Sequence, residues 1–354
     1  IKKLVEIGTN DDSSKSPKEE NGQESKCHLD NQNYSLDISL NDINGMSFHL
    51  VYQYAVWCMK HDNDMKVMPH EVKQVFHDYL DKKLGEYTIS RHAVLGVFFP
   101  RFYHMDISLV KNILGQINTS ENIWIAFWDG YMSGNTLVMY VFDDLYKLYD
   151  QFLNDENLIQ NRKLKQPYYS TINHIMMAYL YNFNNVDHSV EKFLNKADKL
   201  TEQNGDNESS MKYCIEQLGE IMKDKSNDSK FNKEKLIKLW KRPSISQHDL
   251  SKWFENSPLD KKTTISLYLD YIKNYPEKFD LYFVPIDVLC LYVKDFPNEV
   301  LDCLEILIDK QANNIIPDKI KDILKLLLNI DNSQIKTKCN RLTKKIEQLE
   351  YDWR

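Results

Sequence analysis

Four soft ligands in the first third of the chain have the residue types of a metal site: Cys58, His61, His70 and His77. A structural zinc site usually takes two pairs of closely spaced ligands, and only Cys58 and His61 form such a pair. His70 and His77 are seven residues apart on one expected helix, too far to share an ion comfortably. We therefore interpret the four as scattered core and surface residues, and the sequence predicts no metal site.

Three aspartates, Asp129, Asp143 and Asp144, have the residue types for paired-carboxylate chemistry. Carboxylates on amphipathic helices more often belong to the solvated face, and a pair without a third ligand has little specificity. The chain also has no GxxxxGK[ST], GxGxxG, HExxH or GxSxG motif. It has only ten glycines, whereas phosphate-binding loops are rich in glycine. The sequence thus predicts no cofactor and no catalytic residues of these kinds.

Arg242 and His248 form the one pair that suggests a nuclease. All-helical ribonucleases of the HEPN type carry an Arg, four to six residues and then a His, and this spacing resembles theirs. In such enzymes the pair polarises a phosphate and moves a proton. Pro243 directly follows the Arg and should break the helix that would align the two side chains. We therefore favour a loop between two helices and keep a metal-independent ribonuclease as the alternative function.

An aromatic-rich segment spans residues 121–149. Trp124, Phe127, Trp128 and Tyr131 are spaced i, i+3, i+4 and i+7, which is one face of a helix. After a turn at 133–135, a second helix carries Tyr140, Phe142, Tyr146 and Tyr149. Burial of a large apolar side chain contributes roughly 1.5–3 kcal/mol, so leaving these aromatics exposed for a ligand would be costly. We expect a helical hairpin whose aromatics face the core, and not a stacking platform.

Composition limits the possible partners. Forty-five basic and 52 acidic residues give a net charge of −7, which argues against a general nucleic-acid surface because phosphate binding needs clustered Lys and Arg. One small basic patch, LIKLWKRP at 236–243, is the exception. No apolar run reaches the length of a membrane span, and no signal peptide is visible. Six widely separated cysteines without a CxxC pair indicate thiols in a reducing cell, so we expect a cytoplasmic protein.

The periodicity is helical from about residue 46 onward, and strand signals are almost absent. We expect residues 1–40 to be a disordered linker or the tail of an upstream domain, because the chain opens without Met and then turns polar. An aromatic-rich helical domain should follow at 41–205, and a helical-repeat domain at 206–354. Asp106 is expected to cap a helix, and the apolar helix from residue 88 is expected to stop near Pro100.

The C-terminal third has a regular spacing of about one expected helix per 20 residues. Pro276, Pro297 and Pro317 stand near expected helix starts. The expected helices of the second half are 168–182, 187–203, 209–224, 231–241, 247–256, 260–274, 280–294, 298–311, 316–329 and 333–349. The predicted fold is all-α, with stacked antiparallel helix pairs of the tetratricopeptide or HEAT type, arranged in one solenoid or in two sub-bundles.

The order of motifs resembles the C-terminal helical region of large bacterial antiviral proteins, such as STAND-type NTPases and sirtuin-domain NADases. The resemblance is carried by LGVFF at 95–99, Asp106, WDGY at 128–131, LIKLWKRP, HDLSKWF and the final helix pair. It covers roughly residues 90–350 and includes no catalytic motif. It implies a sensor that binds a phage protein, or a scaffold, with the chemistry located upstream.

The sequence therefore predicts a non-catalytic helical-repeat region that binds a protein partner. That partner would be a phage protein or the upstream effector domain, with self-association as a further possibility and a structural oligomerisation scaffold as an alternative function. Stacked helix pairs expose an extended surface, on which Tyr268, Tyr271 and Tyr282 are candidate contact residues, although core packing is the commoner fate of each.

Overall fold

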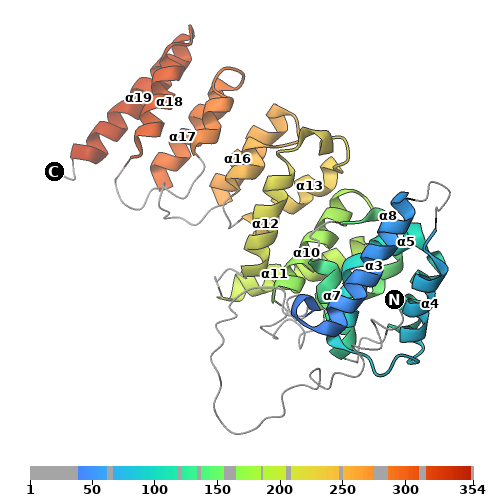
Figure 1. The fold of residues 1–354 in the computed structure, drawn as a ribbon. Coiled ribbons are helices and arrows are strands. Elements are labelled where there is room, and N and C mark those ends of the chain that lie inside the picture. Colours follow the sequence, from blue (N-terminus) through green and yellow to red (C-terminus); the bar gives the residue numbers. More distant parts are fainter. Residues whose placement is uncertain are drawn as a thin grey trace. The chain divides into compact units, whose positions relative to one another are not determined.

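A computed structural model shows the fold of the chain (Figure 1). It describes residues 39–61, 67–117, 122–133, 137–154, 165–184, 186–204, 209–246, 250–274, 286–310 and 316–351. Within these ranges the regular elements are helices and there is no strand, so the predicted all-α class is confirmed. None of the helices in these ranges has both the length and the apolar character needed to cross a membrane. The expected linker at 1–40 lies almost wholly outside the described residues.

The chain divides into two compact units, residues 1–175 and 176–354. The division falls within α10 (Lys165–Leu180), whereas the sequence predicted a change of domain after residue 205. Helix α11 (Asp187–Asn204), which the sequence analysis assigned to the first domain, packs in the second unit against α14 (Pro243–Ser246). The boundary between the two units therefore does not lie in the polar loop after α11.

The first unit is built around the pairing of two helices, α5 and α7. Its elements are α3 (Ile43–His61), α4 (His70–Leu80), α5 (Ile89–Met105), α6 (Ile107–Gln116), α7 (Asn122–Met132), α8 (Met139–Asn154) and the first part of α10. A Cβ atom on Gly96 of α5 would lie 1.9 Å from the carbonyl oxygen of Phe127, and one on Gly130 of α7 would lie 2.0 Å from that of Ala93. Two glycines at the crossing therefore let the two backbones touch.

Helix α5 differs from its predicted extent, because it continues through Pro100 to Met105. Phe99 and Phe102 on either side of the proline are completely buried, and this packing outweighs the local preference of proline to end a helix. The following boundary is as predicted. Asp106 caps α6, since its Oδ1 accepts hydrogen bonds from the backbone N–H groups of Ser108 (2.9 Å) and Leu109 (3.3 Å).

The second unit consists of short helices that pack on their neighbours. After α11 come α12 (Ser209–Ile221), η3 (Lys225–Asn227), α13 (Lys233–Trp240), α14, α15 (Ser251–Glu255), α16 (Lys261–Asn274), η5 (Ile286–Leu291), α17 (Pro297–Lys310), α18 (Asp318–Leu328) and α19 (Ser333–Tyr351). Helix α16 packs against α17, and α18 against α19, which matches the predicted stacking of helix pairs.

One predicted helix of the second unit is wrong in type. The segment expected as a helix at 280–294 contains the short 3-10 helix η5, and residues 280–285 lie outside the described part. Two of the three prolines stand at helix starts as predicted: Pro297 begins α17, and Pro317 directly precedes α18. Pro276 lies outside the described ranges.

Candidate functional site

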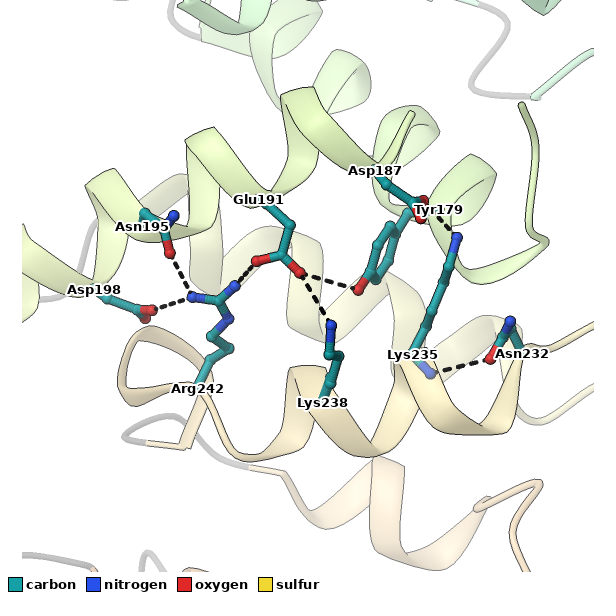
Figure 2. A network of polar contacts seen from close by, with 9 residues as sticks. All are labelled: Tyr179, Asp187, Glu191, Asn195, Asp198, Asn232, Lys235, Lys238 and Arg242. Atoms are coloured by element: carbon teal, nitrogen blue, oxygen red, sulfur yellow. Dashed lines mark hydrogen bonds and ion pairs between the residues drawn. The ribbon is translucent and has the colours of Figure 1, made fainter. Parts of the chain in front are cut away.

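Arg242, the arginine of the alternative ribonuclease pair, is held by carboxylates (Figure 2). It lies just after α13, and the segment expected as a loop between two helices contains the short helix α14, which begins at Pro243. The guanidinium forms ion pairs with Glu191 and with Asp198 (2.9 Å) and donates a hydrogen bond to Asn195 Oδ1 (2.7 Å). All three partners project from α11. His248, the other member of the proposed pair, lies outside the described residues.

The polar contacts around Arg242 extend along the α11–α13 interface (Figure 2). The second oxygen of Asp198 accepts hydrogen bonds from the N–H (3.0 Å) and the hydroxyl (2.6 Å) of Ser244, at the start of α14. Lys235 on α13 forms an ion pair with Asp187 at 2.5 Å. Lys235 on α13 and Arg242 just after its C-terminal end thus face carboxylates of α11. These contacts form a structural tie between the helices.

This tie changes the interpretation of Arg242. A group that polarises a phosphate must present free donors to the substrate, whereas the donors of Arg242 point to Glu191, Asp198 and Asn195. Its side chain is also largely covered, with an exposed fraction of 20%. The geometry therefore explains Arg242 through packing and adds no support to the ribonuclease alternative.

The other candidate ligands are dispersed. Nδ1 of His61 lies 2.9 Å from the carbonyl oxygen of Trp57, and Nδ1 of His77 lies 2.9 Å from Asn112 Nδ2. Among the residues that the structure describes, no three His, Cys, Asp or Glu side chains lie together as a metal site would need. Asp129 is buried, and Asp144 is exposed and accepts a hydrogen bond from the Tyr103 hydroxyl.

The aromatic segment belongs to the core, as the sequence predicted. Trp124, Phe127, Trp128 and Tyr131 are all buried. The Trp128 indole N–H donates to Thr171 Oγ1 (3.1 Å), and the Tyr149 hydroxyl lies 3.1 Å from that of Tyr131. Tyr140 is the exception to the expected inward orientation: it is half exposed, and its hydroxyl donates to the carbonyl oxygen of Pro100.

Two of the three tyrosines named as candidate contact residues are core residues. Tyr268 and Tyr271 are buried beside Phe254, with ring centroids 4.9 and 5.6 Å from its ring. Tyr282 lies outside the described residues. An interaction surface has to be sought elsewhere in the molecule.

Helix α3 has such a surface, which was not predicted from the sequence. One face of α3 packs in the core through Phe48, Val51, Tyr52 and Ala55. A second apolar row is exposed on another face, and we call it the α3 outer row. Its members and their exposed fractions are Ile43 (38%), Met46 (49%), Leu50 (54%), Tyr54 (36%) and Trp57 (56%).

The α3 outer row has the spacing of a helix-binding seam. Its steps are 3, 4, 4 and 3 residues, which average 3.5, the repeat at which one helix keeps facing another. No Asp, Glu, Lys or Arg occurs from Ile43 to Met59. A helix that is apolar all round is normally buried. The sequence therefore already indicated a second buried or binding face, because α3 has no charged face.

The C-terminal end of the α3 outer row is aromatic and ordered by ring contacts. Trp57 lies between Tyr54 and His61, with centroid distances of 6.3 and 4.8 Å and near-parallel planes. The Tyr54 hydroxyl donates to Glu71 Oε1 (3.3 Å) on α4. These contacts hold the large rings in one orientation, which lowers the entropy cost of binding a partner.

The chain matches no protein-family model, no curated protein and no solved structure. The resemblance to bacterial antiviral proteins therefore stays a prediction, and the function has to be argued from the surface itself.

Proposed function

We propose that this chain is a non-catalytic helical region that binds a protein partner, and that the α3 outer row is the binding surface. The observation that carries the proposal is an uncharged row of five exposed large apolar side chains on one helix. Scattered surface apolar residues are normal, whereas contiguous ones mark interaction sites. Tryptophan and tyrosine, both present in the row, are enriched among the residues that dominate binding energy.

The chemistry of the row favours a helix of a protein over other partners. A 3.5-residue repeat is complementary to a second apolar helix. Nucleic acid needs clustered cations, and the row has none between Ile43 and Met59. The negative net charge of the chain, −7, points the same way.

The biological setting is part of the proposal and rests on the sequence alone. The motif order of residues 90–350 supports a sensor or scaffold region of a larger bacterial antiviral protein. The five cysteines in the described ranges are free thiols, which supports a reducing, cytoplasmic setting. As a sensor the region would bind a phage protein, and as a scaffold it would hold copies of its parent protein together.

Site-specific photo-crosslinking tests the binding surface. A photoreactive phenylalanine analogue replaces Leu50 in cells that express the full-length protein, and the matched control carries it at Leu326, an exposed leucine of α18. We expect discrete higher-mass adducts from position 50 and none from position 326. No adduct from position 50, or the same adducts from both positions, would refute the proposal. The mass of the adduct distinguishes a second copy from another protein.

A further inference from the structure

Building on the proposed binding surface, we propose that the partner of the α3 outer row is the same row of a second copy of this chain. The two helices would lie antiparallel about a two-fold axis that passes through Leu50. A two-fold interface is isologous, which means that the same patch is used by both copies and must match itself after rotation. The row meets this condition in its positions, its size pattern and its charges.

The positions of the row are symmetric about Leu50. Ile43 and Trp57 are each seven residues from it, and Met46 and Tyr54 are each four residues from it. An antiparallel pair centred there places Ile43 against Trp57 of the second copy, Met46 against Tyr54, and Leu50 against Leu50. A partner of any other kind would not require this palindromic spacing.

The side-chain sizes match in the same arrangement. Each aromatic ring faces an aliphatic side chain, Trp57 facing Ile43 and Tyr54 facing Met46. Large residues opposite smaller ones interlock better than large residues opposite each other. A parallel pair in register would instead place Trp57 against Trp57 and Ile43 against Ile43, which leaves the helices unevenly spaced along their length.

Charge selects the antiparallel direction as well. Asp42 directly precedes α3 and Lys60 lies in its last turn, so opposite charges stand at the two ends of the row. An antiparallel pair brings these opposite ends together, and Lys60 of one copy then comes near Asp42 of the other. A parallel pair would instead bring equal ends together, with Lys60 near Lys60 and His61 near His61. Lys60 is exposed and Asp42 is half-buried, where it also attracts Arg91.

The area is sufficient for a dimer at the lower limit of specific interfaces. With about 200 Å² for a large side chain, the exposed fractions of the row leave on the order of 500 Å² per copy, or about 1,000 Å² for a pair. Specific interfaces begin at about this size. We therefore expect a dimer that dissociates on dilution.

The oligomeric state of the purified chain is the first test. Sedimentation velocity over a dilution series should show a monomer–dimer equilibrium for the wild type and for Leu326→Glu, and a monomer for Leu50→Glu. Far-UV circular dichroism of Leu50→Glu should match the wild type. A wild type that stays monomeric at every concentration, or a Leu50→Glu chain that still dimerises, would overturn the self-pairing. The proposed protein binding would survive that result if position 50 cross-links to a different protein in cells.

Disulfide trapping tests the register of the pair. Leu50→Cys lies on the two-fold axis and should form a covalent dimer on mild oxidation. Ile43→Cys should not, because the two copies of residue 43 would be about 21 Å apart at 1.5 Å per residue, but a mixture of Ile43→Cys and Trp57→Cys chains should cross-link to each other. The wild type, which retains Cys58, is the control. Efficient trapping of Ile43→Cys alone would show a parallel pair and contradict the proposal.

Discussion

The Tyr79 hydroxyl lies 2.7 Å from Nδ1 of His92, and both side chains are completely buried in the first unit. The backbone N–H of Thr88 donates to the same hydroxyl at 3.0 Å. The His92 ring meets Trp124 edge-on, with centroids 4.7 Å apart. Burial lowers the pKa of His92 from 6.5 to about 3, so the core holds a neutral imidazole at physiological pH.

This buried histidine predicts a loss of stability in mild acid. In the unfolded chain His92 has its ordinary pKa of 6.5 and binds a proton below that pH, whereas the folded chain binds it only below about 3. The contribution is therefore fully present above pH 6.5 and is lost as the pH falls from 6.5 towards 3. From pH 7 to pH 5 we expect the free energy of unfolding of the first unit to fall by about 2 kcal/mol through His92. Urea titrations at each pH measure it.

The control for this prediction is His92→Gln, which keeps a polar side chain and cannot titrate. The variant can be less stable at every pH, but its stability should change less between pH 7 and pH 5 than that of the wild type. Carboxylates titrate in both proteins and cancel in the comparison. Equal pH slopes for the two proteins would show that His92 is not the neutral buried group described here.

The contact between α5 and α7 predicts a large effect from adding one methyl group. Gly96→Ala would place a Cβ within 1.9 Å of the Phe127 carbonyl oxygen, so the helices have to move apart, at a cost of about 3 kcal/mol. Gly115 on α6 has no atom near the corresponding position, and Gly115→Ala should be neutral or stabilise by up to about 1 kcal/mol. Thermal melts of the two variants decide this. Similar melting temperatures would show that the crossing is looser than the structure indicates.

Features of the fold that depend on local interactions are predicted from the sequence, and those that depend on contacts between distant residues are not. The 3.6-residue periodicity and the Asp106 cap are local, and they correctly predict most helices and the inward face of Trp124, Phe127 and Trp128. The continuation of α5 through Pro100 depends on packing by other helices, and periodicity does not contain that information. Arg242 was interpreted through His248, six residues away, although its observed partners lie on α11, 44–51 positions earlier.

The candidate surface was missed for a different reason. Helix α3 has two apolar faces, and Phe48, Val51, Tyr52 and Ala55 form the one that packs in the core. A helix that is apolar on two faces gives a weak periodic signal, because one row obscures the other. Only the burial of the first row shows that the second, centred on Leu50, remains exposed.

The Asp106 cap should be separable from the charge of Asp106. Its Oδ1 caps α6, and its Oδ2 forms a 3.0 Å ion pair with Lys73 on α4. Burial by itself raises the pKa of this carboxyl, but the hydrogen bonds from Ser108 and Lys73 outweigh it and the pKa is lowered. Asp106→Ala should cost about 1–2 kcal/mol, and Asp106→Asn, which still caps, should cost less. Equal losses in urea titrations would mean that the Lys73 pair, and not the cap, carries the stability.

Arg242 provides the sharpest distinction between packing and catalysis. If it ties α11 to α13 and α14, Arg242→Ala leaves Asp198 partly buried without its cation and Glu191 with only the 3.8 Å contact of Lys238, and the second unit should lose about 1–3 kcal/mol. The matched control is Lys241→Ala, which removes an exposed neighbouring cation and should change stability by less than about 0.5 kcal/mol. Arg242→Lys should be intermediate, because a lysine keeps the charge but cannot contact Glu191, Asp198 and Asn195 at once. Hydrogen–deuterium exchange of peptides from α11 and α13, followed by mass spectrometry, measures the stability of the second unit in all three variants. An Arg242→Ala chain as stable as Lys241→Ala would contradict the structural role and return the arginine to the list of candidate catalytic groups.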